Sequence, residues 1–289
     1  MVEFAQFLVS GLIVGAIYAL VALGFSVTFR TTGIVNFAQG EFVMLGGLLT
    51  AGFVRIFDVS ILMAAASALL LSMAVGWLLG TGLRRLRSAT EFRLVLVTLA
   101  TALGLQAVAL MVFGPDPLRY GSPIGGGIIR LGEVTVVKHG ILVVATALVL
   151  VVVLATFLKR TRWGRAMVAT SNDRDAARSV GVNVGLVVTI AFVLAAALGA
   201  VGGLLLTPLA AISYNAGFLM SLKGFAAAVL GGMTSPLGAV AGGFIIGVVE
   251  AFASGYLSSG YKDSVALAAL VLILIVRPEG LFGRQVRAA

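Results

Sequence analysis

The chain has no cysteine and a single histidine, and only 11% of its 289 residues are charged. The lack of cysteine excludes disulfides, thiolate nucleophiles and sulfur-ligated metals, and one histidine excludes a His-based metal cluster. We therefore expect no metal site. The hydrolase motifs G-x-S-x-G and H-E-x-x-H are also missing, so we expect no catalytic residue and no enzymatic activity in this chain.

What the chain has in abundance is apolar residues, which make up 60% of it. A water-soluble domain could not cover such a composition with a polar surface. The net charge is +9, but the basic residues lie in short loops between apolar runs and not on one stripe, which argues against nucleic-acid binding. We expect an integral membrane protein in contact with lipid.

Apolar runs long enough to cross a bilayer follow one another along the chain. The first, from about Ala5 to Phe29, lacks the basic start and Ala-x-Ala exit of a signal peptide and is interpreted as a retained helix. Further spans are centred near Val43–Val54, Ile61–Leu79, Leu94–Phe113, Ile141–Leu158, Leu186–Leu206, Phe218–Leu230, Leu237–Leu257 and Val265–Val276. We predict an all-α polytopic protein of about eight or nine transmembrane helices, forming one transmembrane domain over residues 1–289.

Two of these spans, near Val43 and near Phe225, are short or interrupted by glycine. Such spans suggest half-helices or re-entrant segments that line a cavity. The segments 10–47 and 192–231 share a faint pattern of a Gly/Ala-rich span, a loop with an asparagine (Asn36, Asn215) and a second Gly-rich segment, which suggests an inverted repeat.

Glycines at four-residue spacing predict close helix packing. They are Gly11 and Gly15, then Gly238, Gly242, Gly243 and Gly247. Such spacing lets membrane helices approach closely, either within one chain or against a second subunit. We favour packing within the chain.

The basic residues also predict orientation, because cytoplasmic loops are enriched in Lys and Arg. Nine crossings place Arg30 and three clusters on one side: Arg84, Arg85, Arg87 and Arg93; Lys159, Arg160, Arg162, Arg165, Arg174 and Arg178; Arg277, Arg284 and Arg287. Arg55, Arg119, Arg130, Lys138, Lys223 and Lys262 fall on the other. The N-terminus is thus expected outside the cell and the C-terminus inside it.

Burying a polar side chain within a membrane costs free energy, so polar residues inside apolar spans are candidates for a function. Asn36, Gln39 and Glu41 directly precede an apolar run, and a half-helix starting there would aim free backbone N–H groups at an anionic group such as a substrate carboxylate. They are candidates for a substrate pathway. Alternatively, Asn36 caps the helix and Glu41 lies at the membrane interface.

Gln106 and Glu250, each inside a predicted span, are the other pathway candidates. Glu250 lines the pathway, pairs with a cation near Lys262, or holds two helices together by a hydrogen bond. His139, at a helix start, is expected to be interfacial.

The loop 114–138 contains Pro115, Pro117, Pro123 and the run Gly125-Gly126-Gly127, which predict an ordered, turn-rich outer cap. It either contacts an external partner or only closes two helices.

The loop 159–184 is the least lipid-like stretch of the chain. Residues 172–181 predict a short helix that Asn172 caps and Gly181 ends. Such a helix is marginal alone, so the membrane surface or another protein should hold it. The small residues Ala176, Ala177 and Gly181 favour docking into a groove.

Three stretches carry a resemblance to a known family. Gly164-Arg165-Ala166, Asp175-Ala176-Ala177 and Gly181-Val182-Asn183 resemble the coupling-helix region of LivH-type permeases of branched-chain amino-acid ABC importers, the LivHM family. Residues 33–47 look like the family's N-F-x-x-G-x-x-x-x-x-G region, and 230–239 with 277–283 are similar to its last third.

The resemblance implies a heteromeric complex. A second, LivM-like permease, two cytoplasmic ATPase subunits (LivG/LivF-like) and a periplasmic substrate-binding protein would be the partners. ATP and Mg would bind to the ATPase subunits, since this chain has no G-x-x-x-x-G-K-[ST] loop. By analogy, ATPase coupling would involve Gly164, Arg165, Asn172, Asp173, Asp175, Ala176, Ala177 and Gly181.

The substrate implied is a branched-chain amino acid, but similar permeases serve urea, short amides and aromatic or other organic acids, and the residues do not separate these. A stand-alone secondary transporter is the competing class. It would require an ion-coupling site, for which Glu41 and Glu250 are the candidates.

Overall fold

The computed structural model describes residues 2–86, 90–258, 260, 262–277 and 280–282. Arg87, Arg284 and Arg287 lie outside the described residues, as do residues 278, 279 and 283 of the stretch 277–283. The side chain of Lys262 is likewise outside them.

The described chain is a helical bundle. Seven of its helices are long and apolar enough to cross a membrane: α1 (Val2–Thr32), α2 (Gln39–Phe57), α3 (Ile61–Arg85), α4 (Glu91–Phe113), α5 (Lys138–Arg160), α8 (Val184–Leu206) and α10 (Pro236–Tyr256). Two shorter apolar helices accompany them, α9 (Ala216–Gly231) and α11 (Lys262–Val276). These helices occupy the predicted spans, and the all-α, multi-pass membrane architecture is confirmed.

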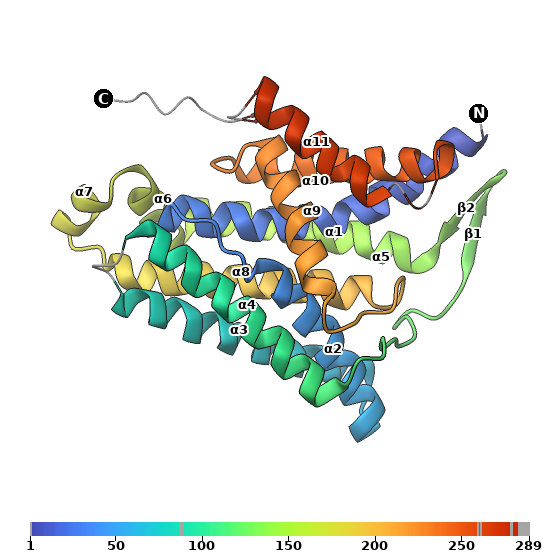
Figure 1. Ribbon diagram of the computed structural model, residues 1–289, viewed down its shortest axis with the longest axis horizontal. Helices are drawn as coiled ribbons and strands as arrows, with labels where there is room; N and C mark the ends of the chain where they lie inside the picture. Colours follow the sequence, from blue (N-terminus) through green and yellow to red (C-terminus); the bar gives the residue numbers. More distant parts are fainter. Residues whose placement is uncertain (1, 87–89, 259, 261, 278–279, 283–289) are drawn as a thin grey trace.

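Helix α1 lies at the centre of this bundle. It packs against α5, α8, α9 and α10, while α2 and α3 pack on the far side of α8 (Figure 1). The short helices α6 (Arg162–Asn172) and α7 (Arg174–Ser179) lie at one end of the long axis. A hairpin of strands β1 (Ile128–Leu131) and β2 (Val134–Val137) lies at the other end.

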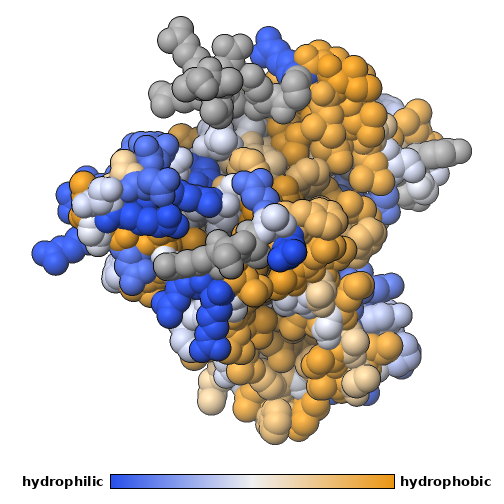
Figure 2. Space-filling model, turned by 60° about the vertical axis from the view of Figure 1, so that its left-hand side comes forward, coloured by the Kyte–Doolittle hydropathy of each residue, from blue (hydrophilic) through white to orange (hydrophobic). Residues whose placement is uncertain are grey.

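Apolar side chains cover much of the outside. Leu62 is 82% exposed and Met111 is 85% exposed, on α3 and α4. Figure 2 shows hydrophobic residues over the sides of the molecule and hydrophilic residues gathered toward the end that carries α6 and α7. Exposure of this kind suits a surface that faces lipid or other subunits rather than water.

Glycines allow α1 and α10 to pack closely. A Cβ on Gly15 would come within 2.9 Å of the Phe244 backbone, and one on Gly247 would overlap the backbone of Gly15. A Cβ on Gly11 would lie 2.6 Å from the Cα of Val248. The prediction that the spaced glycines pack helices within the chain is confirmed.

Both α2 and α9 begin near the middle of the bundle. In Figure 1 the segment 33–38 runs back from the end of α1 before α2 starts, and the segment 207–215 runs back from the opposite end of α8 before α9 starts. Irregular backbone at this depth agrees with the re-entrant segments expected from the sequence. The pairs α1–α2 and α8–α9 have the inverted arrangement that the faint repeat suggested.

Local structure differs from expectation at three places. The loop 114–138 is ordered as predicted but contains an antiparallel hairpin in which Ile128 pairs with Val137. The loop 159–184 contains two helices rather than one. Lys223 was grouped with the basic residues on the outer side, but it lies within α9 and is buried.

Candidate functional site

The N-terminal parts of α2 and α9 cross in the interior of the bundle. The backbone N–H of Gly40 donates to Ser221 Oγ at 2.8 Å, and Ser221 Oγ donates to the Phe37 carbonyl at 3.2 Å. A Cβ on Gly40 would overlap the Gly217 carbonyl. The glycine therefore permits the crossing, and the hydroxyl of Ser221 fixes it.

Glu41 is the charged residue at this crossing. It is 1% exposed, and its Oε1 accepts a hydrogen bond from Gln106 Nε2 on α4 at 2.7 Å. The carboxylate lies against the first turn of α9, where a Cβ on Gly217 would overlap it. The partial positive charge of a helix N-terminus stabilises a carboxylate there. The alternative that Glu41 lies at the membrane interface is wrong.

Asn36 and Gln39 are fully buried beside it. Asn36 Oδ1 accepts from the Ala38 N–H at 3.1 Å, within the turn before α2, and the N-cap position itself is Ala38. The alternative that Asn36 caps the helix is therefore wrong. Gln39 Nε2 donates to the Ala195 carbonyl of α8 at 3.0 Å.

Each of these three side chains retains one polar atom without a partner among the described residues. The atoms are Asn36 Nδ2, Gln39 Oε1 and Glu41 Oε2. A buried polar group without a hydrogen bond costs roughly 1–3 kcal/mol, so three within six residues are costly. Together they offer one amide donor and two oxygen acceptors to a polar solute or to water.

A second buried polar cluster joins four helices. Lys223 Nζ on α9 lies 2.8 Å from Glu250 Oε1 on α10 and 2.6 Å from Asp263 Oδ1 on α11. Tyr18 on α1 accepts from Lys223 at 3.0 Å and donates to Glu250 Oε2 at 2.7 Å. The cation that pairs with Glu250 is thus Lys223, not one near Lys262. Both oxygens of Glu250 have partners within the bundle.

The loop between α5 and α8 is held by its own caps. Thr161 caps α6 by accepting from the Gly164 N–H at 2.9 Å. Gly164 is buried, and a Cβ there would overlap the Phe157 carbonyl. Gly164 therefore sets the sharp turn from α5 into α6, while Arg165 is exposed.

Helix α7 is shorter than predicted and has a different cap. Asn172 is the last residue of α6, and Asp173 caps α7 by accepting from the N–H groups of Asp175 and Ala176 at 2.8 and 2.9 Å. The prediction that Asn172 caps this helix is wrong, because the side chain one residue later satisfies the free donors. Gly181 follows with φ +86°, the left-handed conformation expected of a residue after a helix.

The small residues around α7 are not equivalent. Ala177 is 3% exposed and buried within this chain, whereas Ala176 is exposed. The prediction that Ala177 belongs to a docking face is therefore wrong. Arg174 donates to the Thr31 carbonyl at 3.2 Å and ties α7 to the end of α1.

The loop 114–138 and the start of α5 contact the end of α8. Tyr120 Oη donates to the Leu204 carbonyl at 2.7 Å, Arg119 donates to the Pro208 carbonyl at 3.0 Å, and His139 Nε2 lies 2.9 Å from the Leu205 carbonyl. These contacts satisfy carbonyls that a helix end leaves free. Burial also raises the pKa of the Tyr120 phenol. His139, expected at the interface, is 3% exposed.

Sequence reasoning missed Tyr18, Lys223 and Asp263. The overlooked indication was Lys223 itself, a lone charge inside the apolar run 218–230. A lysine in that position requires an acidic partner at the same depth. Ser221 and Gly217 gave no comparable indication, because small residues are common in all these helices.

Comparisons with known proteins cover nearly the whole chain. The family model described as branched-chain amino acid transport system / permease component matches residues 7–276. The high-affinity branched-chain amino acid transport system permease protein LivH of Salmonella typhimurium is 33% identical over 97% of this chain and 96% of that protein. The corresponding protein BraD of Pseudomonas aeruginosa is 31% identical over 98% of this chain and 96% of its own length.

A solved structure has a similar fold. One chain of PsaBC from Streptococcus pneumoniae in complex with Fab superposes with a TM-score of 0.52 over 98% of this chain and 95% of that chain. The sequence identity is 11%, so this likeness concerns the fold alone.

Proposed function

The chain belongs to the family of branched-chain amino acid transport system permease components, and from this premise we propose that it carries branched-chain amino acids across the membrane as a subunit of an ATP-driven importer. The chain is a non-catalytic permease subunit in this role. The relatives are named for high-affinity branched-chain amino acid transport, which favours these substrates over urea, short amides and organic acids.

The observation that carries the proposal is the α2–α9 crossing. Asn36, Gln39 and Glu41 each keep a buried polar atom without a partner among the described residues, where the N-terminal parts of α2 and α9 cross. A transported zwitterion has an ammonium group, which can donate hydrogen bonds to the carboxylate and amide oxygens. It also has a carboxylate, which can accept a hydrogen bond from an amide N–H. We assign these three residues, with Gln106 as the group that orients Glu41, to the substrate pathway.

For Glu250 we propose a structural role. Its carboxylate is paired with Lys223 and Tyr18, so it is not a free acceptor for substrate. The same pairing weakens the competing idea of a secondary transporter, because one of its two ion-coupling candidates is already neutralised by a lysine.

The exposed part of helix α7 is the proposed contact with an ATPase subunit. Asp175, Ala176 and Gly181 are exposed at the hydrophilic end of the bundle, and Arg174 links the helix to α1. Movement imposed on α7 would therefore reach α1. Asp173 forms the cap that keeps α7 folded, and Asn172, Gly164 and Arg165 lie in or beside α6.

Partners and orientation follow from this role. A LivM-like second permease, two LivG/LivF-like ATPases that bind ATP and Mg, and a periplasmic binding protein would complete the importer. Helices α6 and α7 and the last turn of α5 carry a cluster of six basic residues, Lys159, Arg160, Arg162, Arg165, Arg174 and Arg178, which supports a cytoplasmic position for this end and a periplasmic N-terminus. We treat the chain as one permease domain with the coupling loop at 159–184.

Co-purification and uptake test the proposal together. The chain is expressed with its genomic neighbours, solubilised in detergent and purified, and the bound subunits are identified by mass spectrometry. We expect two ATPase subunits, a second permease and ATP-dependent leucine uptake in liposomes that contain the binding protein. Transport by the chain alone without ATP would overturn the importer role, and uptake of urea or aromatic acids in place of leucine would overturn the substrate.

A further inference from the structure

A groove runs between α5 and α10 at the end of the bundle that carries α6. Both helices pack against α1 but make little or no contact with each other, so α1 forms the floor. The groove encloses a cavity of about 230 Å³. Its apolar lining comes from Leu23, Val151, Leu154, Ala155, Leu158 and Leu237, which is a wall suited to a hydrocarbon chain.

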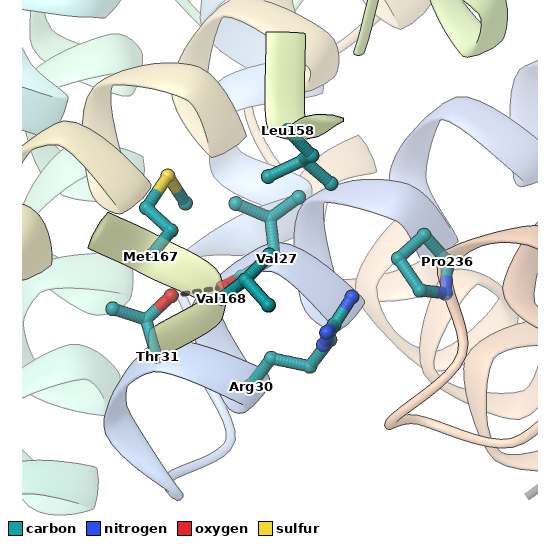
Figure 3. A pocket seen from close by; sticks show the side chains of 7 residues that line it. All are labelled: Val27, Arg30, Thr31, Leu158, Met167, Val168 and Pro236. Atoms are coloured by element: carbon teal, nitrogen blue, oxygen red, sulfur yellow. Dashed lines mark hydrogen bonds between the residues drawn. The ribbon is translucent and has the colours of Figure 1, made fainter. Parts of the chain in front are cut away.

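Two basic residues line the same cavity, Arg30 and Lys159. They lie in the last turns of α1 and α5, where the apolar spans end and the headgroup region of a bilayer begins. Figure 3 shows the Arg30 side chain extending between Val168 and Pro236. Arg30 makes no hydrogen bond or ion pair with the described residues, so none of them occupies the donors of its guanidinium.

Arg30 also lines a neighbouring polar cavity of about 640 Å³. The acidic residue at that cavity is Asp173, and its carboxylate already accepts two N–H groups as the cap of α7. Among the described residues, none that lines the apolar groove has an acidic side chain. The described residues therefore place a positive charge at this end of the groove.

We propose that this groove binds an anionic phospholipid, with the phosphate at Arg30 and Lys159 and an acyl chain along α5 and α10. Arginine binds phosphate oxygens through its planar fork, and lysine adds a point charge. Basic sites between transmembrane helices favour anionic headgroups such as those of cardiolipin. A free phosphate would leave the apolar lining of the groove unoccupied, whereas a lipid fills it with an acyl chain. The lining therefore favours a lipid over a free phosphate.

Lipid binding to the detergent-purified importer is measured by native mass spectrometry after titration with phosphatidylglycerol, with phosphatidylcholine and with glycerol phosphate. We expect phosphatidylglycerol to bind at least tenfold more tightly than phosphatidylcholine, and glycerol phosphate not to bind at millimolar concentration. Arg30→Gln should weaken phosphatidylglycerol binding about tenfold. Ala155→Phe, which fills the groove, should weaken binding of the lipid while the purified protein keeps its melting temperature.

Arg160→Gln is the matched control, because Arg160 is an exposed neighbour of Lys159 that does not line the groove. An equal loss in Arg160→Gln and Arg30→Gln would show general attraction to a basic surface and overturn the site. Equal binding of glycerol phosphate would assign the site to free phosphate. A photo-crosslinking residue at Leu237 that captures a partner subunit instead of lipid would also overturn the proposal.

Discussion

Lys223 and Glu250 form a buried ion pair, with Nζ 2.8 Å from Oε1, between two helices of the bundle. The lysine side chain is 3% exposed and the glutamate side chain 9% exposed, so water screens the pair little. Asp263 forms a salt bridge with the same lysine, and its side chain is 39% exposed. One cation thus holds two carboxylates on α10 and α11.

Replacement of Lys223 by methionine should destabilise the protein strongly. The change keeps an unbranched side chain, one atom shorter, but leaves Glu250 and Asp263 without their cation. Removing one partner of a buried pair costs about 3–5 kcal/mol. The free energy of unfolding in detergent measures this loss.

The double variant Lys223→Met with Glu250→Gln should recover part of the loss, because the buried charge is removed with its partner. Lys138→Met, at an exposed lysine, is the control and should change little. Equal stability of the wild type and Lys223→Met would contradict a structural role for the cluster.

Gly247→Ala should weaken the packing of α1 against α10. The added Cβ would overlap the backbone of Gly15, and overpacking of a tight interface typically costs about 1–3 kcal/mol. Gly104→Ala is the matched control, since a Cβ there meets nothing within 4 Å. Thermal unfolding of both variants in the same detergent compares them, and equal melting temperatures would show that the close approach is not required.

Glu41→Gln should impair transport while assembly persists. The replacement has the same shape but lacks the negative charge that we propose receives the substrate ammonium. We expect leucine uptake to fall at least tenfold in liposomes that contain the complete importer, with unchanged subunit stoichiometry. Gln106→Leu removes the hydrogen bond to Glu41 and should reduce uptake less. Normal uptake by fully assembled Glu41→Gln importer would exclude this carboxylate from the pathway.

Much of the fold could be predicted because hydrophobicity and span length act locally along the chain. The apolar runs predicted the helices, and the four-residue glycine spacing predicted close packing within the chain, of which the contact of Gly15 with α10 is an example. Which helices would meet was not predicted. The exact cap of α7 was missed because Asn172 and Asp173 are both good capping residues. Only the backbone geometry decides which side chain reaches the free N–H groups.

The candidate site could be predicted in part for a similar reason. Asn36, Gln39 and Glu41 are conspicuous before an apolar run, so their burial was foreseeable. Their neighbours were not, because the contact of Glu41 with Gly217 joins residues distant in sequence. The partner of Glu250 was likewise missed, since the choice between Lys223 and a residue near Lys262 depends on how α9 and α10 pack.

Helix α7 gives the most direct test of coupling, because two adjacent alanines differ in burial. Ala176 is exposed, whereas Ala177 is 3% exposed. Ala176→Arg should therefore leave the chain folded and the importer assembled but should uncouple ATP hydrolysis from uptake, by placing a bulky charge in the proposed ATPase contact. Ala177→Arg forces a charge into the interior, so it should lower the melting temperature and the yield of assembled importer.

ATP hydrolysis and leucine uptake are measured on the same proteoliposomes, with melting temperature as the control for folding. Coupled uptake in Ala176→Arg would exclude this face of α7 from the contact, whatever the result for Ala177→Arg.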